Sequence, residues 1–167
     1  MLRENEFDAP WGRSLKLSTT ICLVVFAGII LTGILLQPGR EGQWQFGMIV
    51  IPTALAVIPA LFLIRGYRIE GNALVIKRLI WETKIDLSEL QSIEIDPKAM
   101  SGSVRLFGNG GLYCFAGIFR NKRLGTFRAF ANDPKRAVVL QSTRRTIVIT
   151  PDSPEDFVAT IDSVRSQ

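Results

Sequence analysis

Two long uncharged runs near the start of the chain constrain its fold more than any other feature of the sequence. They cover residues 17–37 and 46–64. At about 1.5 Å per residue, a helix of roughly 20 residues reaches across the ~30 Å hydrocarbon core of a bilayer. Buried helices of a soluble protein are the alternative, but such helices seldom run this far without a charge. The sequence therefore predicts two transmembrane helices, at 17–37 and 46–64.

The residues around these runs predict how the helices are connected and oriented. The connection QPGREGQ, at residues 37–43, is short and rich in helix breakers, which predicts a tight hairpin. The connection carries only Arg40 as a cation, whereas the flanking segments carry Arg3, Arg13, Lys16, Arg65 and Arg68. By the positive-inside rule, both termini are expected in the cytoplasm. Trp11, Trp44 and Tyr67 fall where interfacial aromatic residues are expected.

The predicted hairpin has the features of an anchor rather than of a transport path. Neither run contains an ionisable Asp, Glu, Lys or Arg, the usual mark of an ion or proton pathway in a membrane. Gly28 with Thr32, and Ala56 with Ala60, have the small-residue spacing that permits close contact between helices. We expect these residues to pack the two helices against each other.

From residue 65 onward the hydrophobic pattern changes to that of a soluble β-rich domain. Alternating or β-branched stretches that predict strands are ALVIKR, WETKIDL, QSIEID, KRAVVLQS and RTIVIT. Short strands at this spacing predict a small antiparallel β-barrel or sandwich. We expect an α+β membrane protein with a cytoplasmic N-terminal segment (1–16), a helical hairpin (17–64) and a cytoplasmic domain (65–167).

A single helix is predicted at the end of the chain. Ser153 can cap it and Pro154 suits its first position. Phe157, Ile161 and Val164 then recur at i, i+4 and i+7 and form one apolar stripe. We expect this helix to cap the core of the sheet.

These motifs together resemble a known family. GYRIEGNALVIK, SELQSIEI and the long tail through FANDPKRAVVL to TIVITPDSPEDFVATI are similar to the bacterial pleckstrin-homology (PH) domain families, over about residues 65–165. Members of these families are often fused to one or two membrane helices. The resemblance implies a PH-like barrel and a location in the bacterial inner (plasma) membrane, and it transfers no catalytic residue.

The glycine-rich stretch FGNGGLYCFAG, at residues 107–117, has two readings. A dinucleotide fingerprint would need a third glycine where the chain has Tyr113, and the residues after it alternate like a strand. We therefore predict a hairpin or bulge at Asn109–Gly110, where a positive φ is needed.

A basic stretch follows, with eight cations and one anion between residues 120 and 145. Solvated turns are one explanation. Attraction to anionic lipid headgroups or to an acidic partner is the other, because cations close to an anionic leaflet contribute roughly 1 kcal/mol each. The candidate binding residues are Arg120, Lys122, Arg123 and Arg128.

The composition argues against catalysis. The chain has no histidine, and its two cysteines, Cys22 and Cys114, are not expected to form a disulfide or a metal site. We predict no cofactor, no metal and no nucleic-acid partner. The predicted function is a non-enzymatic, membrane-anchored module that binds a protein, another copy of itself or anionic headgroups. The alternatives are an accessory subunit of a larger membrane complex and a small lipid- or small-molecule-modifying enzyme.

Overall fold

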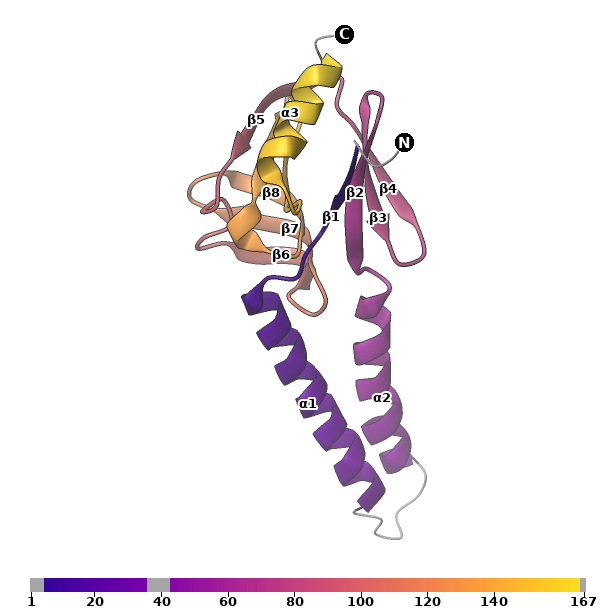
Figure 1. Cartoon of the computed structure of the whole chain (residues 1–167). Helices are drawn as coiled ribbons and strands as arrows, with labels where there is room; N and C mark the ends of the chain where they lie inside the picture. The colour runs from indigo at the N-terminus through magenta and orange to yellow at the C-terminus, as the bar shows by residue number, and fades with distance from the viewer. Residues whose placement is uncertain (1–4, 36–42, 166–167) are drawn as a thin grey trace.

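The computed structural model of the chain describes residues 5–35 and 43–165. Two helices, α1 (Arg13–Leu35) and α2 (Gln43–Ala60), extend together from one end of a β-rich domain (Figure 1). The predicted connection at 37–43 lies almost entirely outside the described residues, as do both chain ends. The fold class is α+β, as expected.

The bounds of both helices differ from the predicted ones. Helix α1 begins four residues before residue 17 and includes Arg13 and Lys16. Helix α2 ends at Ala60 instead of residue 64, because Ile64 opens a strand and its side chain is buried in the core. The close contact between the helices also differs: a Cβ on Gly33 would lie 2.7 Å from Cβ of Met48, whereas Gly28 has nothing within 4 Å.

The helix pair is connected to a four-stranded antiparallel sheet. Its order is β1 (Glu6–Asp8), β2 (Ile64–Glu70), β3 (Ala73–Arg78) and β4 (Glu82–Asp86). The sequence reading found no strand in the N-terminal segment, yet Phe7 pairs with Tyr67 across β1 and β2. Both helices are therefore inserted between two neighbouring strands of one sheet.

The second sheet has six strands: β5 (Leu90–Ile95), β6 (Val104–Gly110), β7 (Phe115–Asn121), β8 (Gly125–Ala131), β9 (Val138–Ser142) and β10 (Thr146–Ile149). Their order is β5-β9-β10-β8-β7-β6, and β8 and β10 are parallel. The prediction of a purely antiparallel sheet is wrong for this pair. After β8, the chain passes through the 3-10 turn Pro134–Arg136 and forms β9 two positions away from β8 in the sheet. Strand β10 then fills the position between β9 and β8.

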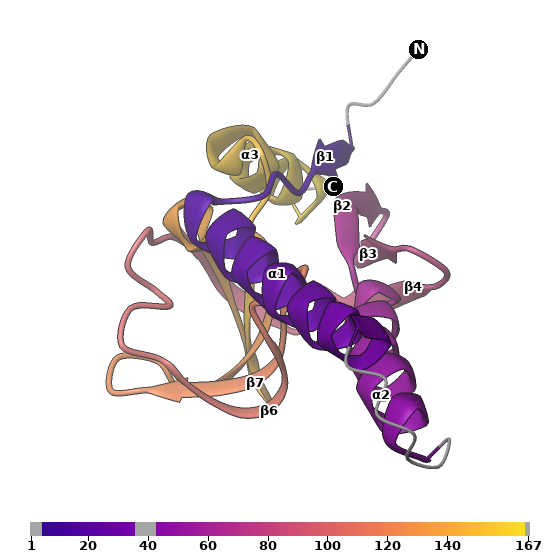
Figure 2. The same cartoon turned by 90° about the horizontal axis from the view of Figure 1, so that it is seen from below.

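The main core lies between the two sheets and is closed by α3 (Pro154–Arg165). As predicted, Pro154 opens this helix, Phe157 and Ile161 are buried, and Val164 packs against the core. The Phe157 ring lies 5.0 Å from that of Phe7 on β1. Seen from below, α1 crosses beneath the space between β2–β4 and β6–β7 (Figure 2).

Tyr67 belongs to this core and not to a membrane interface, contrary to the prediction. Its side chain is fully buried, and its hydroxyl donates to the Phe130 carbonyl at 2.6 Å. The same hydroxyl accepts a hydrogen bond from the backbone N–H of Thr150 at 3.2 Å. Burial raises the pKa of Tyr67 to about 12.

Candidate functional site

The junction between the helices and the domain is held by specific hydrogen bonds. The buried Asn132 side-chain amide donates to the carbonyls of Ala9 (2.8 Å) and Ile64 (2.9 Å), one on each side of the helix pair. At the start of α1, the Ser18 hydroxyl donates to the Gly111 carbonyl at 2.6 Å. The position of the domain relative to the helices is therefore fixed at several points.

Exposed apolar side chains cover both helices and continue onto the domain. The turn between β3 and β4 exposes Leu79, Ile80 and Trp81, and the Trp81 ring lies 5.1 Å from that of Phe62, just after α2. Strand β6 exposes further apolar side chains, with Phe107 75% exposed. We call these exposed residues of the β3–β4 turn and of β6 the apolar collar: Leu79, Ile80, Trp81, Val104, Leu106 and Phe107. The apolar collar lies at the end of the domain from which the helices extend.

By length and composition, α1 is the one helix of the described residues that qualifies as a membrane span. The apolar part of α2, Phe46–Ala60, is shorter. The length and composition of α2 alone therefore do not establish the second predicted membrane span.

A pocket of about 680 Å³ lies where the helices meet the sheets. One wall is apolar and is supplied by α1 and by α2 with the residues just after it: Phe26, Leu55, Ile58, Pro59 and Phe62. The domain side contributes the arginines of three different strands, Arg78, Arg105 and Arg128. No carboxylate is found among the described residues that line it.

Arg78 is the most enclosed of these arginines, with 9% of the residue exposed. It donates to the Phe62 carbonyl at 3.1 Å and to the Thr83 hydroxyl at 3.2 Å. Its guanidinium carbon also lies 5.3 Å from the centre of the Phe130 ring. Burial lowers the pKa of Arg78, and the positive charge of Arg128 lowers it further.

Arg105 and Arg128 complete the basic side of the pocket. Arg128 is exposed, and its guanidinium carbon lies 5.1 Å from the centre of the Phe130 ring. Arg105 donates to the Gly108 carbonyl at 3.2 Å. Within the described part of the chain, no carboxylate forms an ion pair with any of the three arginines of the pocket.

The structure brings the four predicted binding residues only partly together. Arg120 and Arg128 lie on the same face of neighbouring strands, because Arg128 pairs with Ile118 and Arg120 is two residues beyond it. Lys122 and Arg123 lie in the turn after β7, and Arg123 contacts the Asp96 carboxylate at 3.2 Å. Of the four, Arg128 alone lines the pocket.

The glycine-rich stretch forms a hairpin, as predicted, but its turn lies two residues later. Gly110 still pairs with Phe115, and the positive φ values occur at Gly111 (121°) and Tyr113 (68°). Gly108 and Gly117 pair directly and both have positive φ; a Cβ on either one would clash with the facing backbone. These two glycines serve the close approach of two strands.

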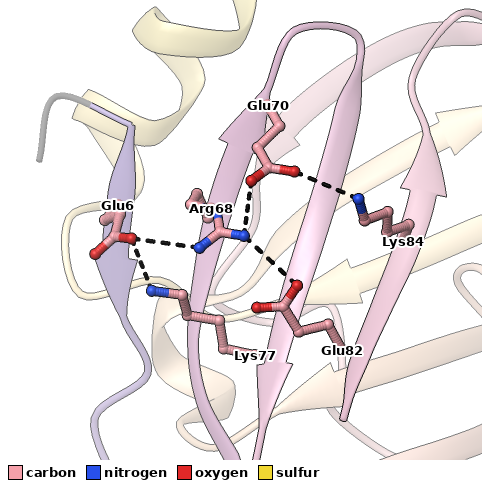
Figure 3. A network of polar contacts seen from close by, with 6 residues as sticks. All are labelled: Glu6, Arg68, Glu70, Lys77, Glu82 and Lys84. Atoms are coloured by element: carbon pink, nitrogen blue, oxygen red, sulfur yellow. Dashed lines mark hydrogen bonds and ion pairs between the residues drawn. The ribbon is translucent and has the colours of Figure 1, made fainter.

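The outer face of the four-stranded sheet carries a balanced network of charges (Figure 3). Arg68 lies at its centre and contacts Glu70 at 2.7 Å and Glu82 at 3.5 Å. Lys77 contacts Glu6 of β1 at 2.7 Å. Because cations and carboxylates alternate there, this face offers no surplus charge to an anion.

Neither cysteine forms a disulfide, as predicted. Cys114 is buried, and its thiol donates to the Phe62 carbonyl at 3.3 Å. Burial raises the pKa of this thiol to about 12. Over residues 5–35 and 43–165, no three His, Cys, Asp or Glu side chains come together as a metal site would require.

Sequence reasoning missed Arg78 and Arg105. Arg78 ends a buried strand and is followed directly by Leu79, Ile80 and Trp81, so an arginine at the edge of an apolar stretch was the available signal. Arg105 has the same kind of setting, between Val104 and Leu106. Their convergence could not be found from the sequence, because it depends on how β3, β6 and β8 are arranged.

Comparison with known proteins agrees with this architecture. The family model described as Bacterial PH domain matches residues 65–165, which is more than half of the chain. No curated protein and no solved structure gives a match. The match covers β3–β10, nearly all of β2, and the whole of α3. The chain therefore belongs to the bacterial PH domain family.

Proposed function

We propose that this protein is a membrane-anchored, non-enzymatic binding module, in which α1 and α2 form a transmembrane hairpin and the PH domain lies at the cytoplasmic face. The observation that carries the proposal is the pairing of β1 with β2. The chain leaves the sheet into α1 and returns from α2 into the same sheet. If α1 crosses the bilayer, α2 must cross it back.

The dimensions of α2 are compatible with this second crossing. Its apolar part, Phe46–Ala60, corresponds to about 22 Å, and the apolar residues 61–63 extend this stretch toward the ~30 Å of a hydrocarbon core. Residues 61–63 continue as a turn, and the apolar collar adds Leu79, Ile80 and Trp81 beside them. A short span that ends against apolar loops fits a domain seated directly on the membrane surface.

A cytoplasmic position for the domain is supported by the cations next to the helices. Arg13 and Lys16, at the start of α1, are exposed, and so is Arg65 after α2. Cations on this side of a span favour retention in the cytoplasm. There the domain would bind a protein, another copy or anionic headgroups, and Arg120, Lys122, Arg123 and Arg128 are the proposed contacts to headgroups or to an acidic partner.

A binding role is favoured over a catalytic one by the side chains that are available. The sequence has no histidine, the side chain whose ordinary pKa lies nearest to neutral pH. The one buried thiol of the domain is held in its neutral form by its raised pKa. A module that positions a partner needs neither group.

The proposal is tested by fractionation and topology mapping of the full chain. We expect the protein to stay in the membrane pellet after alkaline carbonate washing, and reporters at either terminus to be active only in the cytoplasm. The control is Val24→Arg with Val25→Arg, in the middle of α1. Two arginines there cost about 2.5–3.5 kcal/mol each on insertion scales and should release the chain. Carbonate release of the unaltered chain, or termini on opposite sides, would refute the hairpin.

A further inference from the structure

The pocket at the helix–domain junction has two ends of different chemistry. At the domain end it presents Arg78, Arg105 and Arg128 without a carboxylate among the described lining residues. At the other end it reaches Phe26, thirteen residues into α1 and therefore about 20 Å along the helix axis from Arg13. An amphiphile with a negatively charged head matches both ends at once.

We propose that this pocket holds one acidic phospholipid of the bilayer, with its phosphate between Arg78, Arg105 and Arg128 and its acyl chains along α1 and α2. The inference rests on the proposed function, because acyl chains reach the pocket only if the helices lie in a membrane. It names a ligand and a site that differ from the exposed basic turn at residues 120–123.

The charge of the pocket supports an anionic occupant. Arg78 is buried beside a second cation, and the interaction with Arg128 destabilises its charged form. A phosphate placed between the two guanidinium groups would replace this repulsion by attraction. Guanidinium groups also bind phosphate through paired, charge-assisted hydrogen bonds, which a single ammonium group cannot match.

The apolar wall favours a lipid over a small soluble anion. Leu55 and Ile58 of α2 are exposed in the chain alone and line the same pocket as the arginines. Acyl chains would cover these side chains, which a phosphate ion would leave in contact with water. The volume of about 680 Å³ lies within the usual ~300–1,000 Å³ of ligand sites. It suffices for a headgroup and the first part of the chains, which then continue along the helices.

The test uses the full chain, delipidated in a mild detergent and titrated with phosphatidylglycerol or phosphatidylcholine under native mass spectrometry. We expect one phosphatidylglycerol per chain, bound at least about 10-fold more tightly than phosphatidylcholine. Arg128→Gln should weaken phosphatidylglycerol binding about 10-fold, as expected for the loss of a hydrogen bond between charged groups, and leave phosphatidylcholine binding unchanged. Arg105→Gln is the second variant and should also weaken phosphatidylglycerol binding, because Arg105 lines the same pocket. Both side chains are exposed, so neither change should prevent folding, and circular dichroism verifies this.

Arg145→Gln is the matched control, because Arg145 is an exposed arginine in the turn between β9 and β10, outside the pocket and outside the proposed headgroup contacts. It should change phosphatidylglycerol binding less than about 2-fold, and glycerol 3-phosphate at the same concentration should not displace the lipid. Equal binding of both lipids, an equal loss in Arg145→Gln, or displacement by glycerol 3-phosphate would each overturn the inference. Carbonate washing of the same chains separates the two proposals: retention without lipid preference refutes the pocket alone, whereas release refutes the anchor.

Discussion

A single buried side chain, that of Asn132, bonds to the backbone on both sides of the helix pair. Its amide donates to Ala9, between β1 and α1, and to Ile64, where β2 begins. The backbone carbonyl of Asn132 accepts a hydrogen bond from the backbone N–H of Gly12 at 3.1 Å. One residue of the domain therefore sets where the chain departs toward the helices and where it returns.

Asn132→Ala should strongly destabilise the protein. The change leaves two carbonyls without this donor, at a cost of about 1–3 kcal/mol each, and it removes the buried Oδ1 of Asn132, which has no hydrogen-bond partner among the described residues. Because this removal offsets part of the cost, we expect the free energy of unfolding to fall by about 2–5 kcal/mol. Denaturant unfolding in detergent, followed by tryptophan fluorescence, measures the change. Asn72→Ala, in the exposed turn between β2 and β3, is the control and should stay within about 0.5 kcal/mol. An unchanged denaturation midpoint for Asn132→Ala would contradict the stabilising role of these two hydrogen bonds.

Two buried groups predict a loss of stability at high pH. The pKa of Cys114 rises from 9.0 to about 12 on folding, and that of Tyr67 from 10.0 to about 12. Because folding favours the neutral forms, their contribution is fully present below pH 9 and is lost as the pH rises toward 12. The unfolding free energy should therefore fall from pH 9 upward.

The Cys114→Ala variant isolates the thiol in this pH dependence. In this variant the unfolding free energy should no longer fall from pH 9. The fall due to Tyr67, which begins near pH 10, should remain. Chemical unfolding of the unaltered chain and of Cys114→Ala at pH 8, 9, 10 and 11 provides the comparison. A decline between pH 9 and 10 that is equally steep with and without the Cys114 thiol would disprove the assignment.

Among the elements, α3 and β1 depend on each other although they lie at opposite ends of the chain. The Phe157 ring of α3 packs edge-on against Phe7 at 5.0 Å and against Tyr67 of β2 at 6.5 Å. All three side chains belong to the main core. Helix α3 thereby fixes the strand that leads into α1.

Phe157→Ala tests this dependence. Removal of a fully buried ring should lower the free energy of unfolding by about 3–5 kcal/mol. We also expect faster proteolysis near β1, because the strand loses its packing partner, and peptide mapping by mass spectrometry locates the cuts. Thr160→Ala, at a half-buried position of α3 where the hydroxyl bonds only to the Asp156 carbonyl of the same helix, should leave both readouts nearly unchanged. A Phe157→Ala chain as stable as the Thr160→Ala chain would refute the role of this contact.

Local sequence patterns predicted individual helices and strands better than they predicted which strands pair with each other. The stripe of Phe157, Ile161 and Val164 identified α3, and strict alternation identified the strand containing Ile85. Strand β1 has only three residues, too few for a period to be recognised. The parallel pairing of β8 with β10 and the meeting of three arginines both depend on the order of strands, which periodicity does not encode.

Considered as a whole, the molecule is organised around the junction between the helix pair and the domain. The hydrogen bonds of Asn132, the apolar collar and the pocket all lie there, whereas the charges on the outer face of the four-stranded sheet balance one another. The family match covers the domain but not β1 or α1. The N-terminal part of this chain thus supplies one strand of the sheet and the helix that we propose as the first part of a membrane anchor.

The pairing of β1 with β2 also has a consequence for the order of assembly. Some sixty residues of chain separate Phe7 from its partner Tyr67, so during synthesis the first strand must wait until both helices have left the ribosome. Phe157, which covers Phe7, emerges later still. If α1 and α2 insert into the bilayer as proposed, insertion therefore precedes completion of the domain, and a chain whose second helix failed to insert would hold β1 and β2 on opposite sides of the membrane.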